Sequence, residues 1–196
     1  MSNSKSESSE INPIDKNLGR IPKVNMITEI DLSQILTMCN SYERLPTILS
    51  YINSIEGSKW LRLLGEWWES FDNVSLYLYK ILNDSPVASR TGPIKEMMDE
   101  EEINYLRQKF NCENLPLDVY RGCYRNVNEN GICYSLSEEI AKKFPSLDRY
   151  SINGEQPIVR HSRVLEDDVI AFKNGCNELE IIARCFTVVS DTNIEM

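Results

Sequence analysis

The stretch Asn177-Glu178-Leu179-Glu180-Ile181-Ile182-Ala183-Arg184 sets two carboxylates two residues apart in what its apolar pattern predicts to be a buried strand. Side chains alternate between the two faces of a strand, so Glu178 and Glu180 are expected to point the same way. Leu179 and Ile181 are then expected to enter a core on the opposite face. Like charges on one face repel each other, so the pair predicts a positive partner. That partner is either a neighbouring Lys or Arg or a cationic substrate or transition state, and an exposed acidic edge is the alternative.

The composition is that of a globular protein, because 41% of the residues are hydrophobic. The 196 residues are enough for one medium domain, or for one domain with an added helical subdomain. The net charge of -9 and the pI near 4.8 argue against a broad basic face for duplex nucleic acid. A local basic channel remains compatible with them. No run reaches membrane-spanning length and no signal-peptide pattern opens the chain. The sequence therefore predicts a cytoplasmic protein with no membrane partner.

The six cysteines are scattered and form no Cys-x-x-Cys pair, and His161 is the sole histidine. Zinc sites use clustered thiolates and imidazoles, so this spacing predicts reduced cysteines and no metal site. A structural role is also expected for His161, with catalysis as the alternative.

The chain divides into three regions. Residues 1–26 are rich in Ser, Asn, Lys and Glu and predict a disordered tail. Residues 27–111 carry apolar side chains at three- and four-residue steps, which predicts helices. The three tryptophans, Trp60, Trp67 and Trp68, are expected in the core of these helices, with a ligand-stacking role as the alternative. Residues 112–196 change to alternation and short apolar runs, which indicates strands. The fold class is therefore α+β, and the helix expected over 97–110 can pack with the β-rich region.

The strands of the β-rich region are expected at 117–120, 131–135, 157–165, 168–172 and 179–189, with a short helix at 138–144.

Two further polar clusters accompany the carboxylate pair. In the first, Arg121 follows an apolar strand and can make a bidentate contact to phosphate, with a structural ion pair as the alternative. Gly122 beside it lets another group approach the backbone closely. In the second cluster a strand ends in hydroxyls before a helix, and helix capping by Ser135 or Ser137 is the alternative to catalysis there. Cys133 is expected to be a small buried residue rather than a nucleophile.

The order of these clusters resembles the ADP-ribosyltransferases of the arginine, serine, glutamate type over about residues 95–185. The supporting motifs are Val119-Tyr120-Arg121-Gly122-Cys123, the Gly131…Ala141…Phe144 spacing, and Asp168-Val169-Ile170-Ala171-Phe172 ahead of the Glu-x-Glu pair. The resemblance implies a split β-sandwich that follows the helical half and binds NAD, as the substrate, in a cleft.

The same resemblance implies roles for individual residues. Arg121 would grip the phosphates and the nicotinamide-side ribose of NAD, and the backbone of Gly122 would bond the nicotinamide amide. Ser135 would orient the catalytic glutamate, Glu180, which stabilises an oxocarbenium-like transition state. Glu178 would position or deprotonate the acceptor, and the Glu-x-Glu form favours arginine.

The hydroxyl motif admits two registers. Cys133-Tyr134-Ser135 can take its place, with a cysteine where the family has a hydroxyl, or Ser135-Leu136-Ser137 can, which makes Ser137 a cofactor-binding residue. Ser135 belongs to both. Tyr134 or Tyr150 can stack on nicotinamide, with core packing or a solvated loop as the alternative.

The resulting hypothesis is an NAD-dependent mono-ADP-ribosyltransferase that acts on a target protein, on arginine, in the manner of a toxin or effector. Two alternatives remain open within enzymes: transfer to a nucleic acid, and NAD hydrolysis. A third alternative is a non-catalytic interaction module, in which the helical half binds a partner protein.

Overall fold

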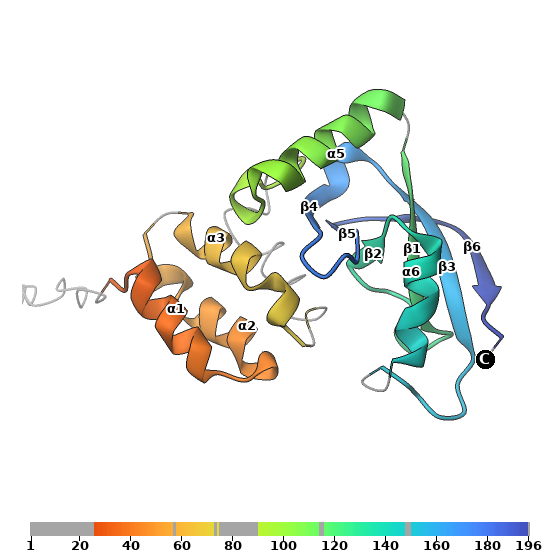
Figure 1. Cartoon of the computed structure of the whole chain (residues 1–196), viewed down its shortest axis with the longest axis horizontal. Helices are drawn as coiled ribbons and strands as arrows, with labels where there is room; N and C mark the ends of the chain where they lie inside the picture. The colour runs from red at the N-terminus through yellow and green to blue at the C-terminus, as the bar shows by residue number, and fades with distance from the viewer. Residues whose placement is uncertain are drawn as a thin grey trace, which may run out of the picture.

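The computed structural model describes residues 26–56, 58–72, 74, 90–113, 116–147 and 150–195. Over these residues the chain is α+β, with helices followed by a six-stranded antiparallel sheet (Figure 1). The disordered tail predicted for residues 1–26 lies, apart from Met26, outside the described residues.

Three helices open the described chain: α1 (Glu29–Met38), α2 (Ser41–Ser50) and α3 (Lys59–Glu66). Thr28 caps α1 and Asn40 caps α2, each through a capping box that satisfies backbone N–H groups at the helix start. The helices lie together at one end of the molecule (Figure 1). After α3, the short 3-10 helix η2 (Trp68–Ser70) leads back towards the sheet.

The apolar faces of these helices share one core cluster with the sheet half. The sheet half contributes Ile132, Ile170, Ala171 and Ile182 to this cluster. Trp60 and Trp68 belong to it and are 5% and 3% exposed, and Trp67 packs against it. The prediction that the tryptophans lie in the helical core is therefore confirmed, and the two regions are joined by apolar packing.

The sheet half begins with the 3-10 helix η3 (Lys95–Met97) and the helix α5 (Glu100–Glu113). Its strands are β1 (Leu117–Tyr124), β2 (Cys133–Ser135), β3 (Pro157–Val164), β4 (Val169–Lys173), β5 (Glu180–Ala183) and β6 (Thr187–Asn193). The helix α6 (Glu138–Lys143) follows β2 and continues into η4 (Phe144–Ser146), and η5 (Glu166–Asp168) precedes β4. The strand order is β4-β5-β2-β1-β3-β6.

Strands are present at the expected places, but two predictions about them are wrong. β1 continues past residue 120 to Tyr124, so Arg121 lies inside the strand rather than after it. The single strand predicted over 179–189 is also wrong. β5 ends at Ala183, and β6 starts at Thr187 on the opposite edge of the sheet. Between them the Arg184 N–H bonds to the Asp168 carbonyl, and the Phe186 ring stacks on Tyr134 at a centroid distance of 3.9 Å. These tertiary contacts turn the chain where the apolar alternation in the sequence continues.

The short β5–β6 connection requires the sheet to fold back on itself. β5 is second and β6 sixth in the strand order, so a flat sheet would separate them by about 19 Å at about 4.8 Å per strand. The four steps from Ala183 to Thr187 span at most about 14 Å. Because the sheet curls, side chains from both of its halves pack together with side chains of α5 in one core cluster. This cluster contains Leu106, Phe110, Leu117, Val119, Val164, Phe172, Ile181 and Ala183.

The two halves of the sheet, β4-β5-β2 and β1-β3-β6, meet at one point. In the ladder between β1 and β2, whose residues are all described, Tyr120 and Ser135 are the only partners. Beyond this pair the strands separate, and the side chain of Arg121 reaches across to β2. The candidate site lies at this junction.

Candidate active site

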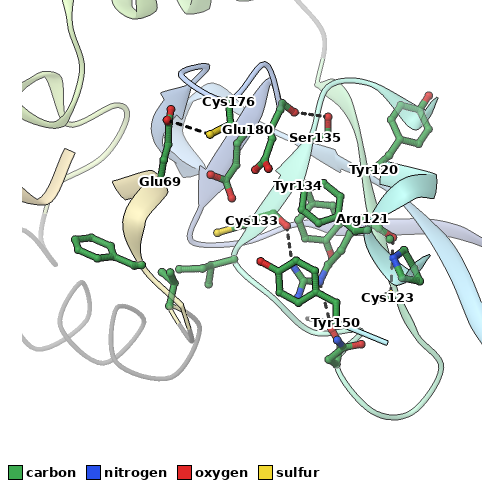
Figure 2. Close-up of a pocket in the computed structure, with 18 of the residues that line it drawn as sticks. Glu69, Tyr120, Arg121, Cys123, Cys133, Tyr134, Ser135, Tyr150, Cys176 and Glu180 are labelled. Atoms are coloured by element: carbon green, nitrogen blue, oxygen red, sulfur yellow. Dashed lines mark hydrogen bonds between the residues drawn. The ribbon is translucent and has the colours of Figure 1, made fainter. Parts of the chain in front are cut away.

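A pocket of about 350 Å³ opens between η2, the middle of the sheet and the end of α6 (Figure 2). This volume lies within the range of about 300–1,000 Å³ that is typical of small-molecule sites. Of the residues singled out in the sequence, the pocket is lined by Arg121, Gly122, Cys133, Tyr134, Ser135, Tyr150, Glu178 and Glu180. Residues from four separate stretches of sequence therefore converge on one cavity.

Glu180 is the first residue of β5 and is half-buried in the pocket wall. The indole Nε1–H of Trp68 donates to its Oε2 atom at 2.5 Å. Burial raises the pKa of the Glu180 carboxyl above its usual value, and the hydrogen bonds from Trp68 and Cys133 oppose this rise. The negative charge of Glu178 raises the pKa further, whereas the positive charge of Arg121 lowers it. The fold thus keeps a carboxylate in a place where its charge is costly.

Glu178 lines the same pocket, but the reason predicted from strand alternation is wrong. β5 begins at Glu180, and the preceding residues Asn177 and Leu179 have φ angles of 55° and 49°. This left-handed backbone interrupts the extended conformation, so Glu178 lies in an irregular segment just before β5 and Glu180 lies in the strand. Leu179 still packs, partly buried, against the cluster that contains Ile181, as expected.

Ser135 supports this irregular segment. It faces Glu180 across the β2–β5 ladder, and its Oγ–H donates to the backbone carbonyl of Glu178 at 2.7 Å. Ser135 also accepts the Ser137 N–H at 3.1 Å. The hydroxyl therefore orients the segment that carries both carboxylates through its backbone, rather than by a bond to the Glu180 side chain.

Arg121 bridges the opening between β1 and β2. Its Nη1 donates to the Cys133 carbonyl at 2.8 Å, and its Nε donates to the Asn128 carbonyl at 3.2 Å. A Cβ at Gly131 would collide with the guanidinium, so a larger residue there would require the Arg121 side chain to move. Among the described residues, the three remaining N–H groups of this five-donor side chain have no hydrogen-bond partner. They can serve an anionic ligand.

Gly122 is close to another part of the protein. A Cβ at Gly122 would overlap the Ala141 carbonyl oxygen, so the group that approaches this glycine backbone is α6. The glycine thus allows α6 to pack on β1 at the edge of the pocket, and this is a structural reason for its presence.

Ser137 and Tyr134 have mainly structural surroundings. Ser137 caps α6 by accepting the Ile140 N–H at 3.3 Å, and it is not part of the pocket lining. Of the two registers, the structure brings only the Cys133-Tyr134-Ser135 residues to the pocket together. The Tyr134 ring is 4% exposed and belongs to the core under the sheet, with the Arg121 guanidinium 6.0 Å from its centroid.

The Cys133 thiol faces the buried Glu180. Burial and the negative charge of Glu180 raise its pKa well above the usual value. A thiol that stays protonated is a poor nucleophile, which agrees with the interpretation of Cys133 as a small, mostly buried residue. The five described cysteines are all free of disulfides.

His161 has structural partners. Its Nε2 lies 2.7 Å from Asp118 Oδ1, and its ring stacks on Tyr120 at a centroid distance of 5.0 Å. Tyr120 lines the pocket and His161 does not. Tyr150 also lines the pocket, and 5.9 Å separates the centroids of the Tyr150 and Phe144 rings.

Sequence reasoning missed the contribution of the helical half. Trp68, Glu69 and Phe71, in or next to η2, line the pocket opposite the strands. Glu69 Oε2 accepts the thiol hydrogen of Cys176 at 3.3 Å, and both side chains line the pocket with Glu180 (Figure 2). A signal did exist, because a buried indole N–H needs an acceptor, but the sequence does not say which acceptor it finds.

No group of three or more His, Cys, Asp or Glu side chains among the described residues is arranged to hold a metal ion. In the same part of the chain, no helix has the length and apolar character needed to cross a bilayer. Comparisons of the chain with known protein families, with curated proteins and with solved structures found no match.

Proposed function

We propose that this pocket binds NAD and that the chain transfers ADP-ribose from NAD to a protein acceptor, on arginine. The observation that carries the proposal is the convergence of Arg121, Ser135 and Glu180 on one pocket from three separate strands. An arginine on a strand, a hydroxyl at a strand end and Glu-x-Glu are the three elements of the family that the sequence resembles.

The first step is cleavage of the bond between nicotinamide and its ribose. The bonding electron pair leaves with neutral nicotinamide, and positive charge develops on the ribose. The Glu180 carboxylate can accept a hydrogen bond from a ribose hydroxyl and stabilise that charge. Burial makes the negative charge of Glu180 costly, as its raised pKa indicates. The attraction between this charge and the ribose strengthens as positive charge develops, so it stabilises the transition state more than the bound substrate.

The second step is capture of the ribosyl cation by the acceptor. Glu178 lines the same pocket from the irregular segment before β5 and can bind a cationic acceptor or take its proton. A guanidinium group also neutralises the repulsion between the two carboxylates. Arginine therefore fits this wall of the pocket better than a neutral acceptor does.

Arg121 suits the negative end of the ligand. Its three open N–H groups can bind the pyrophosphate of NAD in the forked geometry that lysine lacks. The narrow junction between β1 and β2 at Tyr120 and Ser135 and the curled sheet are compatible with the split β-sandwich of the family.

The test uses purified protein, NAD labelled in its adenylate portion and a cell lysate. The wild type is compared with Glu180→Gln, and Glu166→Gln serves as the matched control because Glu166 is exposed on η5. We expect label on macromolecules with wild type and Glu166→Gln, and a loss of about a hundredfold or more with Glu180→Gln, as for other groups that stabilise transition-state charge. Circular dichroism verifies that each variant is folded.

The acceptor is identified by digestion of the labelled product. Label released by protease supports transfer to protein, and label released by nuclease supports the nucleic-acid alternative. Nicotinamide release without label indicates NAD hydrolysis with water as acceptor. Folded wild-type protein that gives neither label nor nicotinamide contradicts an NAD-dependent enzyme and favours a non-catalytic interaction module.

A further inference from the structure

We infer that Trp68, a residue of the helical half, is a positioning residue that holds the Glu180 carboxylate in the geometry and charge state needed for NAD cleavage. This inference rests on the proposed function. It assigns to the helical half a part in the chemistry of the pocket.

The contact is direct and well enclosed. Trp68 is 3% exposed, and its Nε1 atom lies 2.5 Å from Glu180 Oε2. The indole N–H is a donor only, so it can bond to an oxygen of the carboxylate but cannot accept a proton from it. The bond holds one carboxylate oxygen, Oε2, against the helical half. The carboxylate is thereby oriented before the substrate enters.

The helical half fixes the position of Trp68. Arg44 of α2 donates from Nη1 to the Ser70 carbonyl at 3.3 Å, which ties η2 to α2. Ser41, at the start of α2, donates from Oγ to Asp72 Oδ2 at 2.6 Å, just beyond η2. The ring of Phe71 meets Trp68 edge-on, with 6.2 Å between the centroids. The indole therefore moves only if η2 and α2 move together.

The hydrogen bond acts against the effect of burial on Glu180. Burial favours the protonated acid, whereas a donor to the carboxylate favours the ionised form. The Trp68 hydrogen bond is the largest influence that lowers the pKa of Glu180. Loss of the donor should therefore raise this pKa, and less of the ionised, active form is then present at a given pH.

The first experiment compares Trp68→Phe with Trp67→Phe in steady-state nicotinamide release from NAD. Phenylalanine keeps an aromatic ring but removes the N–H. Trp67 is the matched control, because it adjoins Trp68 but stacks under Arg44 at 5.3 Å and is not part of the pocket lining. We expect Trp68→Phe to lower kcat by about tenfold to a hundredfold, as for loss of a hydrogen bond to a charged group, with little change in KM for NAD.

The pH profile separates positioning from general structural damage. In Trp68→Phe the acidic limb of kcat should shift to higher pH, because ionisation of Glu180 then requires a higher pH. In Trp67→Phe the limb should stay where it is in the wild type. Equal pH profiles for Trp68→Phe and the wild type would overturn the inference.

The second experiment does not depend on NAD. The effect of Glu180→Gln on unfolding free energy is measured by denaturant titration, once in the wild type and once in the Trp68→Phe variant, at several pH values from mildly acidic to mildly alkaline. In alkaline solution the Glu180→Gln change should stabilise the Trp68→Phe variant more than the wild type, because the buried charge in that variant lacks its donor. The difference should disappear in acid, where the carboxyl is protonated in both proteins.

The two experiments distinguish the two ways to fail. A wild type without NAD cleavage contradicts the proposed function, and the stability measurement still decides whether Trp68 controls Glu180. A wild type that cleaves NAD, combined with equal effects of Glu180→Gln in the wild type and in Trp68→Phe, overturns the role of Trp68 and leaves the proposed function intact.

Discussion

Glu180 is expected to lower the stability of the folded chain at neutral pH. Its pKa is raised on folding, chiefly by burial, so the folded state binds the proton more tightly than the unfolded state. Stability therefore falls as pH rises from the unfolded pKa, about 4.3, through the folded pKa. Glu180→Gln keeps the acceptor for Trp68 and carries no charge, so its stability relative to the wild type should increase over this pH range. Urea titrations of both proteins across that pH range measure the difference in unfolding free energy. A difference that does not vary with pH would contradict a raised pKa for Glu180 in the folded state.

The edge strand β6 depends on an ion pair, because most of its side chains are exposed. Arg160 of β3 is 8% exposed and binds both carboxylate oxygens of Asp191 at 2.9 Å. Glu129 also lies 3.3 Å from Arg160. Removing one partner leaves a buried charge poorly paired, which typically costs about 3–5 kcal/mol. With Glu129 still in place, Asp191→Asn should fall at the low end of this range.

Denaturant unfolding measures this change, with Asp167→Asn as the control because Asp167 is exposed on η5. The bond from Arg160 also lowers the pKa of Asp191. The stabilisation is therefore present above the unfolded pKa, about 3.9, and is lost as pH falls through the folded pKa. The cost of Asp191→Asn should shrink in acid, and equal stability losses for the two variants would exclude this role for the ion pair.

At the scale of the whole molecule, the close contact between α3 and η3 sets how the helical half sits on the sheet half. A Cβ at Gly65 would overlap the Met97 backbone, so α3 can approach η3 this closely only with glycine there. Alanine favours a helix by about 1 kcal/mol over glycine, but overpacking of about 1–3 kcal/mol opposes this gain. Gly65→Ala should therefore destabilise the chain by up to about 2 kcal/mol, the difference between these two effects.

The same change should also affect the pocket, because α3 leads into η2. We expect Gly65→Ala to lower nicotinamide release through displacement of Trp68, although residue 65 does not line the pocket. Glu66→Ala is the control, since its bond to Arg62 is an exposed helix pair of small energetic value. Full activity of folded Gly65→Ala would show that the contact between α3 and η3 does not position the site.

Several features of the fold and site could be predicted from short stretches of sequence. Apolar periodicity located the helices and most of the strands, and α6 ends at Lys143, one residue before the predicted end. Arg121, Ser135 and Glu180 were singled out by their place beside apolar runs, and all three line the pocket. Periodicity reports which face of an element is buried, which is why it located these helices and strands.

The prediction that Glu178 shares a strand with Glu180 is wrong because the left-handed backbone at Asn177 and Leu179 has no signal in the apolar pattern. The single strand over 179–189 is wrong for a related reason. Alternation continues through Phe186, and only the curl of the sheet reveals that the chain has crossed to another edge. In both cases the pattern of side chains is the same whether the backbone continues or turns.

Local chemistry in the sequence was thus sufficient for the α+β class, for the helix and strand pattern and for the polar residues worth testing. Only the tertiary structure decided which groups meet. Trp68 and Glu180 are 112 positions apart, and Gly122 touches α6 rather than an open surface. The physical reason is that a buried donor or acceptor requires some partner, whereas its identity depends on how the sheet curls and how the helices pack on it.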